Sequence, residues 1–223
     1  MFIEDNRTRV KICGITELEH ARYASGALID FLGFIFYEKS PRYISPEKAG
    51  AIINWIEGPQ KVGVFVNQPL DDVNHYALMS GVDYVQLHGE ETPEYIDLLD
   101  KPVIKSFRIH PEMSEDDLRK VIDPYLNHTE YLLFDAWDDK EYGGTGKTFD
   151  WDMLQAIGED IPFFLAGGLG TKNIRKAIKT VRPFAVDLSS SLESEPGKKD
   201  FDKMDDFIEE MREIWDLQEM GDL

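Results

Sequence analysis

Eight short runs of apolar, often β-branched residues recur along the chain, and each run is followed by a segment with helical spacing. Such alternation is the pattern of successive strand–helix units around a parallel sheet. Eight units in 223 residues fit a closed (β/α)8 barrel, the TIM barrel of the α/β class, better than an open doubly wound sheet. The runs span residues 10–13, 31–36, 61–66, 84–87, 103–107, 131–134, 163–166 and 184–188.

Helix signals lie in the gaps between these runs. Ser45 followed by Pro46 reads as a helix N-cap and first helical residue, and Ser114 with Asp117 resembles a capping box. The Gly- and Pro-containing stretches fall where strand-to-helix loops are expected, so no internal linker is evident. We therefore expect residues 1–223 to form a single (β/α)8-barrel domain.

The charge and composition exclude several classes of partner. A formal net charge of -19 makes nucleic acid or an anionic membrane surface an improbable partner, because both require a field that attracts phosphate. No apolar stretch approaches the roughly 20 residues that cross a bilayer, and the first ten residues lack the layout of a secretion signal. We expect a cytoplasmic protein. A small phosphorylated substrate stays compatible with the charge, since backbone N–H groups bind phosphate locally.

Cys13 is the only cysteine, so the chain can form neither an internal disulfide nor a cysteine-based zinc site by itself. It ends the first run, and barrel enzymes place their chemistry at the C-terminal ends of the strands. Two interpretations remain open: a small buried hydrophobe, or a base in its thiolate form. A base requires a neighbour that lowers the thiol pKa from about 8.5, and Lys11 projects to the same side of the strand.

Three other side chains at strand ends are candidates for chemistry. Asp135 directly follows the sixth run; it is either an acid that donates a proton or a cap and loop anchor. Arg42 follows the second run in a proline-stiffened loop, where its fork suits a carboxylate, unless it is a surface residue. His88 closes the fourth run and is expected to line the mouth rather than bind a metal, because no ligand cluster accompanies it.

Three stretches have the composition of oxyanion-binding loops: 143–147, 166–169 and 187–191. Glycine lets the backbone approach a ligand, and the loops after the seventh and eighth strands of a barrel commonly hold phosphate. The first stretch lacks the full spacing of a nucleotide-binding P-loop. We expect phosphate binding without a nucleotide, a metal or another cofactor.

In order along the chain, the stretches KICGIT, GFIFYEKSPRYI, VGVFVN, VQLHGEE, LFDA, GGTGKTFDW, LAGGL and DLSSSLE…PGKKD resemble the phosphoribosylanthranilate isomerase family of tryptophan biosynthesis. The resemblance runs from about residue 9 to residue 200. It implies a cofactor-independent isomerase with a (β/α)8 barrel. The implied reaction is the Amadori rearrangement of N-(5-phosphoribosyl)anthranilate, an aminoaldose, to an aminoketose, 1-(2-carboxyphenylamino)-1-deoxyribulose 5-phosphate.

The resemblance also implies roles for individual residues. Asp135 matches the acid that protonates the ring oxygen, and Cys13 matches the base that removes the C2 proton. Arg42 matches the position that holds the anthranilate carboxylate. The other implied substrate-binding residues are Gly167, Gly168, Ser189 and Ser190, whose backbone would hold the phosphate, and His88 and Asp187, which would line the mouth.

Two departures from the family pattern and two alternatives remain. Gly170 and Thr171 stand where the family usually has an Asn-Pro-like turn after the seventh strand. Ser191 stands where the family usually has glycine, which would cost about 1 kcal/mol or more if the position requires positive φ. The related aminosugar isomerase of histidine biosynthesis performs the same rearrangement but typically has aspartate where Cys13 stands. A phosphate-binding barrel without catalysis is the other alternative, against which the presence of both Cys13 and Asp135 argues. The sequence makes no prediction of the oligomeric state.

Overall fold

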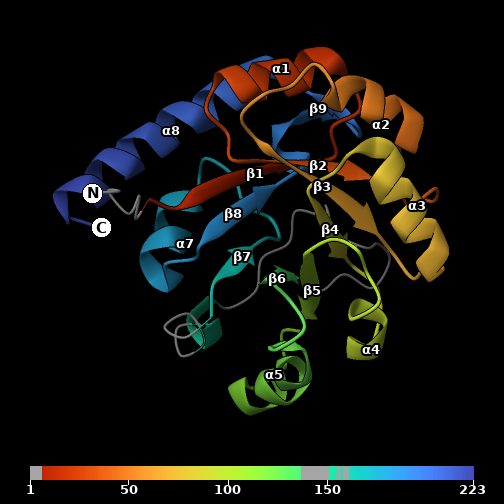
Figure 1. The fold of residues 1–223 in the computed structure, drawn as a ribbon. Coiled ribbons are helices and arrows are strands. Elements are labelled where there is room, and N and C mark those ends of the chain that lie inside the picture. The colour runs from red at the N-terminus through yellow and green to blue at the C-terminus, as the bar shows by residue number, and fades with distance from the viewer. Residues whose placement is uncertain (1–6, 137–150, 155–156, 158–160) are drawn as a thin grey trace, which may run out of the picture.

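The computed structural model describes residues 7–136, 151–154, 157 and 161–223, and within them eight parallel strands close into a barrel (Figure 1). Each strand pairs with the next, and β8 returns to pair with β1. The (β/α)8 fold expected from the sequence is confirmed. The strands are β1 (Arg9–Cys13), β2 (Phe31–Ile35), β3 (Gln60–Phe65), β4 (Tyr84–Leu87), β5 (Val103–Ile109), β6 (Tyr131–Ala136), β7 (Phe163–Leu165) and β8 (Ala185–Leu188).

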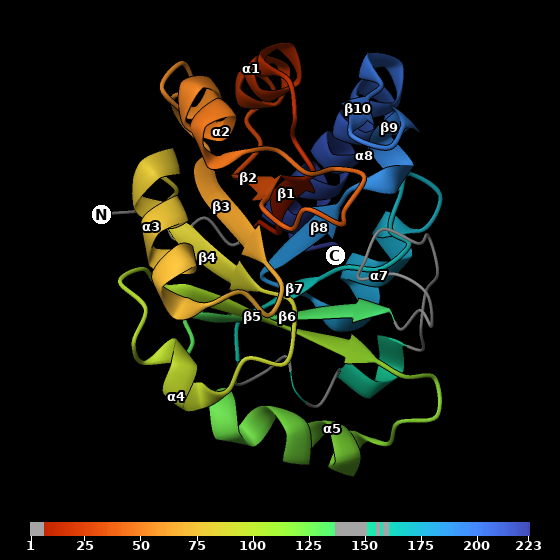
Figure 2. The ribbon, with the colours of Figure 1, turned by 90° about the vertical axis from the view of Figure 1, so that its right-hand side faces the viewer.

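The helices lie around the outside of the barrel (Figures 1 and 2). They are α1 (Leu18–Gly26), α2 (Pro46–Ile53), α3 (Leu70–Ser80), α4 (Pro93–Ile96), α5 (Glu115–Ile122), α7 (Ile174–Val181) and α8 (Phe201–Met220). Short 3-10 helices are η1 (Asp123–Tyr125), η2 (Trp151–Leu154) and η3 (Ser190–Leu192). A small antiparallel hairpin of β9 (Glu193–Glu195) and β10 (Lys198–Lys199), which the sequence did not predict, precedes α8. The glycine-rich stretch 143–147 lies outside the described residues.

Two predicted helix starts are confirmed. The Ser45 side chain accepts a hydrogen bond from the backbone N–H of Lys48, and Pro46 is the first residue of α2. Ser114 and Asp117 form a reciprocal capping box at the start of α5. Such caps satisfy backbone donors that have no partner within the helix.

The interior of the barrel changes character from one end to the other. Alternate side chains of a barrel strand point inward, and near the N-terminal ends these are apolar and pack as one cluster: Phe31, Val62, Ile104, Leu133, Phe164 and Ala185. Toward the C-terminal ends the inward positions become polar, with Lys11 paired to Asp187 and Gln86 bonded to Ser106. An apolar layer therefore fills the N-terminal end of the barrel, and polar and titratable side chains lie at its C-terminal end.

Two strands continue further than the apolar runs predict. The ladder between β5 and β6 extends to the pairs Arg108–Asp135 and Ile109–Ala136. Asp135 therefore belongs to β6 itself rather than following it, because backbone pairing continues past the last apolar side chain. Its position is set by a strand rather than by a loop.

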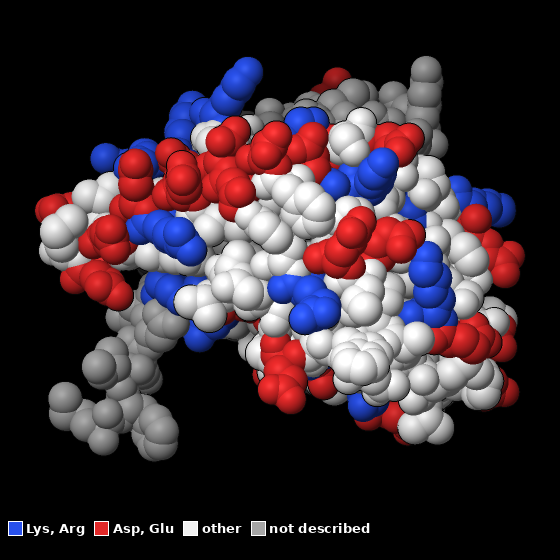
Figure 3. All heavy atoms as spheres, turned by 90° about the horizontal axis from the view of Figure 1, so that it is seen from above, with Lys and Arg blue, Asp and Glu red and all other residues white. Residues whose placement is uncertain are grey.

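The outer surface is rich in acidic side chains, which Figure 3 shows with lysine and arginine side chains interspersed among them. This distribution agrees with the formal net charge of -19. Among the described residues no helix combines the length and the apolar character that a membrane span requires.

Candidate active site

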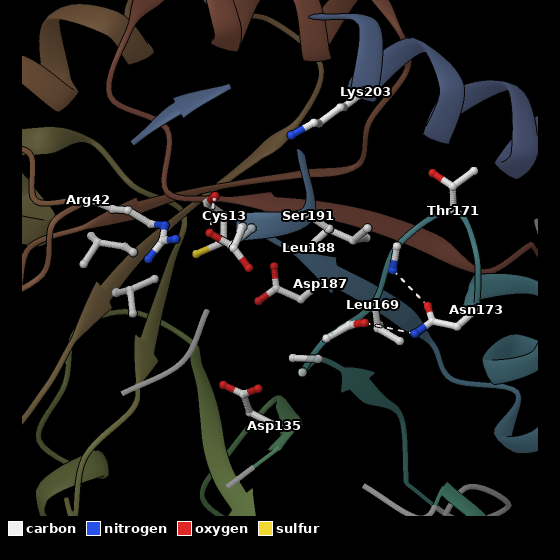
Figure 4. A pocket seen from close by; sticks show the side chains of 18 of the residues that line it. Cys13, Arg42, Asp135, Leu169, Thr171, Asn173, Asp187, Leu188, Ser191 and Lys203 are labelled. Carbon is white, nitrogen blue, oxygen red and sulfur yellow. Dashed lines mark hydrogen bonds between the residues drawn. The ribbon is translucent and has the colours of Figure 1, made fainter. Parts of the chain in front are cut away.

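A cavity of about 970 Å³ opens at the C-terminal ends of the barrel strands. Figure 4 shows Cys13, Arg42, Asp135 and Asp187 disposed around it, from four separate parts of the chain. The structure brings together the nine residues to which the sequence analysis assigned a catalytic or substrate-binding role. The nine are Cys13, Arg42, His88, Asp135, Gly167, Gly168, Asp187, Ser189 and Ser190.

Cys13 is the last residue of β1 and is 7% exposed. Gly33 on the neighbouring strand makes room for the thiol, since a Cβ there would lie 2.7 Å from Cys13 Sγ. Burial raises the pKa of the Cys13 thiol and Asp187 adds to the rise, whereas the ammonium groups of Lys11 and Lys199 oppose it without reversing it. Lys11 does lower the thiol pKa, as a base would require, but burial outweighs it and leaves the pKa above its ordinary value.

Lys11 and Asp187 form a buried ion pair on the wall of the cavity. Lys11 Nζ donates to Asp187 Oδ2 at 2.7 Å, and their side chains are 0% and 8% exposed. Asp187 Oδ1 is buried without a hydrogen-bond partner among the described residues. Asp187 lines the cavity, while this oxygen is itself covered by the surrounding protein.

Asp135 and His88 face one another, with 3.4 Å between Asp135 Oδ2 and His88 Nε2. On the other side of the ring, Gln86 Nε2 lies 3.2 Å from His88 Nδ1 and also donates to Ser106 Oγ at 3.2 Å. Gln86 thus holds the ring on its Nδ1 side, while Nε2 faces Asp135 and makes no hydrogen bond within the described part of the chain.

Arg42 is held by a carboxylate of the chain itself. Its Nε lies 3.0 Å and 3.1 Å from the two carboxylate oxygens of Glu193, and its Nη2 donates to Glu193 Oε2 at 2.8 Å. Arg42 is 7% exposed, so the surface-residue interpretation is wrong. Lys199 Nζ reaches the same carboxylate at 2.9 Å.

The loop after β7 has a backbone conformation that favours glycine. Gly167 and Gly168 adopt positive φ values of 87° and 62°, and a Cβ at Gly167 would lie 2.5 Å from the backbone nitrogen of Ala136. Asn173 braces this loop, accepting from the Gly170 N–H and donating to the Gly168 carbonyl, both at 2.9 Å (Figure 4). The conformation at Gly167 excludes any other residue type without rearrangement.

Ser191 does not carry the strain that positive φ would impose. It lies within η3, and the described non-glycine residues with positive φ are Leu28, Asn67 and Arg182. Position 191 does not require positive φ, so the cost of about 1 kcal/mol for a non-glycine residue there does not arise. Serine fits the position because the loop turns there with an ordinary 3-10 backbone.

Sequence reasoning missed several residues of this site: Gln86, Asn173, Glu193 and Lys199 were given no role. Glu193 and Lys199 fall within the motif stretches DLSSSLE and PGKKD, where a charged residue next to serine or glycine reads as a solvated loop. In the structure these two side chains are only 6% and 2% exposed, and this burial distinguishes them from solvated loop residues. Within the described part of the chain, no three His, Cys, Asp or Glu side chains are grouped so that they could hold a metal ion.

A closed barrel with a thiol, two carboxyl groups, an arginine fork and two glycine- and serine-containing loops around one cavity has the features of a (β/α)8-barrel enzyme that acts on a small anionic molecule. Residues 10–210 match the sequence model described as N-(5'phosphoribosyl)anthranilate (PRA) isomerase. The chain belongs to the N-(5'-phosphoribosyl)anthranilate isomerase family, and it is an isomerase. This confirms the resemblance seen in the sequence.

Individual relatives cover almost the whole chain. The N-(5'-phosphoribosyl)anthranilate isomerase of Geobacter sulfurreducens is 46% identical over 201 residues, which are 90% of this chain and 96% of the relative. The crystal structure of phosphoribosyl anthranilate isomerase from Thermotoga maritima superposes with a TM-score of 0.84 at 38% identity, covering 92% of this chain and 99% of that one. A further phosphoribosyl anthranilate isomerase, solved in complex with reduced 1-(o-carboxyphenylamino)-1-deoxyribulose 5-phosphate, has a TM-score of 0.81 at 37% identity, with coverages of 92% and 99%.

Proposed function

We propose that this cavity rearranges N-(5'-phosphoribosyl)anthranilate to 1-(2-carboxyphenylamino)-1-deoxyribulose 5-phosphate, with Cys13 as the base and Asp135 as the acid. The reaction is that of the family to which the chain belongs. The observation that carries the assignment is that Cys13 on β1 and Asp135 on β6 line one cavity together with Arg42 and both glycine- and serine-containing loops. A proton donor and a proton acceptor therefore approach one bound molecule from separate walls.

The acid step opens the ring. Asp135 donates a proton to the ring oxygen, the C1–O bond breaks, and the nitrogen lone pair forms an iminium ion. His88 Nε2 lies 3.4 Å from Asp135 Oδ2, so the imidazole is close enough to interact with the carboxylate that this step leaves. Oδ1 of Asp135 is left to face the substrate.

The base step moves the double bond. Thiolate Cys13 removes the C2 proton, the electron pair neutralises the iminium ion as an enolamine, and the enolamine tautomerises to the ketone. Because burial keeps the thiol pKa high, the thiolate is a minor but strongly basic form, and Lys11 and Lys199 limit the cost of forming it. No electrons leave or enter the substrate, so the rearrangement needs no redox cofactor.

Binding divides between the two ends of the substrate. Glu193 uses Nε and one N–H of Nη2 on Arg42, and a guanidinium has five N–H donors, so donors remain for the anthranilate carboxylate. The Gly167–Gly168 and Ser189–Ser190 turns line the cavity, and their backbone N–H groups would hold the phosphate. Asp187 and His88 line the space between, where the sugar hydroxyl groups would lie.

The substrate and its product are polyanions, which do not cross a bilayer unaided. We accordingly propose that residues 1–223 work as one domain in the cytoplasm, on a small phosphorylated molecule, without nucleic acid or membrane as a partner.

Turnover by purified protein tests the proposal. Cys13→Ala and Asp135→Asn should each lower turnover by at least about 100-fold, because each removes a group that transfers a proton. Binding of the reduced product analogue should change little in both variants, which confirms that the cavity is intact. The bulkier bisphosphorylated aminoaldose of histidine biosynthesis is the control substrate, and we expect no turnover of it.

Turnover within about threefold of the parent in either variant would remove that residue from its assigned role. Absence of turnover in the parent protein would overturn the function itself.

A further inference from the structure

Two buried charged side chains lie beside Arg42 and do not themselves transfer a proton in the steps described above. Glu193 is the first residue of β9 and Lys199 the last of β10, and the hairpin register pairs them. They are 6% and 2% exposed. Lys199 Nζ lies 2.9 Å from Glu193 Oε1, and the same carboxylate holds the guanidinium of Arg42. Arg42, Glu193 and Lys199 are called the hairpin cluster below.

Lys199 joins three parts of the site. Its ammonium donates to the carbonyl oxygen of Cys13 at 2.6 Å, to the carbonyl oxygen of Ser189 at 3.1 Å and to Glu193 Oε1 at 2.9 Å. Burial lowers the pKa of Lys199, and the charge of Glu193 opposes this. Three acceptors around one nitrogen require three N–H donors, which only the protonated amine has, so Lys199 is charged.

The hairpin cluster consequently has an excess of positive charge. Burial disfavours the charged form of Glu193, but Arg42 and Lys199 outweigh this and hold the pKa of its carboxyl group below the usual range. Two cations and one carboxylate leave a net charge of +1 in a buried environment. An unbalanced buried charge is unfavourable, and an anion that reaches it from the cavity is bound correspondingly more strongly.

Only one member of the hairpin cluster lines the cavity, and that is Arg42. An incoming carboxylate would therefore contact Arg42 while the surplus charge that attracts it depends on Lys199 behind it. Lys203 adds to the fixation of the hairpin by donating to the Glu193 carbonyl oxygen at 2.6 Å. The hairpin thus holds both the direction of the Arg42 fork and the charge of its surroundings.

We propose that Glu193 and Lys199 are positioning residues for recognition of the substrate carboxylate: Glu193 fixes the fork of Arg42, and Lys199 supplies the positive charge that a second carboxylate neutralises. The inference rests on the proposed role of Arg42 in binding that carboxylate. It assigns to the hairpin β9–β10 a part in specificity that acts through Arg42 rather than by contact with the substrate.

The test compares two ligands that differ only in the carboxylate. One is the reduced product analogue, and the other is its counterpart made from aniline, which lacks the carboxyl group. Isothermal titration calorimetry gives the Kd of both ligands. The Kd of the aniline counterpart divided by the Kd of the product analogue measures how much the carboxylate adds to binding. A general loosening of the fold weakens both ligands alike and leaves the ratio unchanged.

Lys199→Met removes the charge and leaves Arg42 paired with Glu193, so the ratio should fall on the order of tenfold. Lys199→Gln keeps N–H donors for the two backbone carbonyl groups and should show the same fall, which separates the charge from the backbone contacts. The double variant Lys199→Met/Glu193→Gln leaves the single charge of Arg42, so it should recover most of the parental ratio. Lys198→Met is the matched control, because Lys198 is an exposed neighbour whose partner Glu195 is also exposed, and it should leave the ratio unchanged.

An unchanged ratio in folded Lys199→Met or Lys199→Gln overturns the inference, and so does a double variant that recovers nothing. Arg42→Ala separates this failure from failure of the proposed function. If Arg42→Ala abolishes carboxylate recognition while the Lys199 variants retain it, only the positioning role is wrong. If Arg42→Ala also retains it, the binding role of Arg42 is wrong and the inference falls with it.

Discussion

Replacing Lys11 with methionine tests the ion pair on the wall of the cavity. Lys11 Nζ lies 2.7 Å from Asp187 Oδ2, and both side chains are buried. Methionine keeps much of the aliphatic length but removes the ammonium group, which leaves both oxygens of Asp187 without a partner among the described residues. Removal of one partner from a buried pair costs about 3–5 kcal/mol if the remaining charge persists.

Asp187 can avoid part of that cost by taking up a proton. Burial raises the pKa of Asp187 against the opposing charge of Lys11, so loss of Lys11 raises it further. Protonating an aspartate with an unfolded pKa of about 3.9 costs about 1.4 kcal/mol per pH unit above that value. Protonation of Asp187 therefore limits the loss in the free energy of unfolding to about 4 kcal/mol at pH 7 and about 1.5 kcal/mol at pH 5.

The direction of the pH dependence follows from the raised pKa. Folded Lys11→Met binds a proton at Asp187 that the unfolded chain does not bind, and this contribution to stability is lost as the pH rises through the folded pKa. We expect a loss of about 3–4 kcal/mol in the free energy of unfolding at pH 7, falling to about 1.5 kcal/mol or less at pH 5.

Urea unfolding followed by circular dichroism and by tryptophan fluorescence, at both pH values, measures this loss, and coincidence of the two probes checks two-state behaviour. The double variant Lys11→Met/Asp187→Asn should recover at least about half of the loss at pH 7, because no charge is then left unpaired. Lys198→Met, at an exposed site, should stay within about 0.5 kcal/mol of the parent. A loss below about 1 kcal/mol at pH 7, or one that is independent of pH, would refute the reasoning.

Three further changes probe the cavity directly. Gly33→Ala places a Cβ 2.7 Å from Cys13 Sγ and should lower kcat by about 100-fold, because it displaces the thiol. Gly26→Ala is the control, since its Cβ meets nothing within 4 Å, and it should leave kcat unchanged. Equal kcat values in the two variants would contradict this reasoning. Arg42→Ala should raise KM more than Arg42→Lys, because lysine keeps the charge and loses only the planar fork; an unchanged KM in both would remove Arg42 from the site. The rate of alkylation of Cys13, the only thiol, should keep rising with pH beyond the ordinary thiol pKa of about 8.5, because burial raises the pKa of Cys13. Mass spectrometry of the alkylated chain measures the rate. A rate that levels off near neutrality would contradict the raised pKa.

The fold and the members of the site were within reach of the sequence because their signals are local. A run of β-branched residues predicts a strand wherever it occurs, and eight strand–helix units leave few alternatives to a closed barrel. Parallel strands bring their C-terminal ends to one face, so Cys13 and Asp135 could be assigned to that end of the barrel, whereas the tertiary structure shows that they line one cavity. The bounds of all eight strands agree with the apolar runs to within two residues.

The electrostatic state of the site was decided by tertiary structure alone. Lys11 pairs with Asp187 across 176 positions, Arg42 with Glu193 across 151, and Lys199 reaches the Cys13 carbonyl across 186. No periodicity links residues so far apart, because their proximity follows from closure of the barrel and from the path of the β9–β10 hairpin.

The thiol of Cys13 shows the same division. The neighbouring cation was visible in the sequence as Lys11, but how deeply the thiol is buried was not, and burial outweighs the cation in setting the pKa. The cost of desolvation depends on everything that surrounds a group in space. The sequence pattern can therefore identify which residues lie at the C-terminal ends of the barrel strands. Their charge states and their hydrogen-bond partners depend on the closed fold.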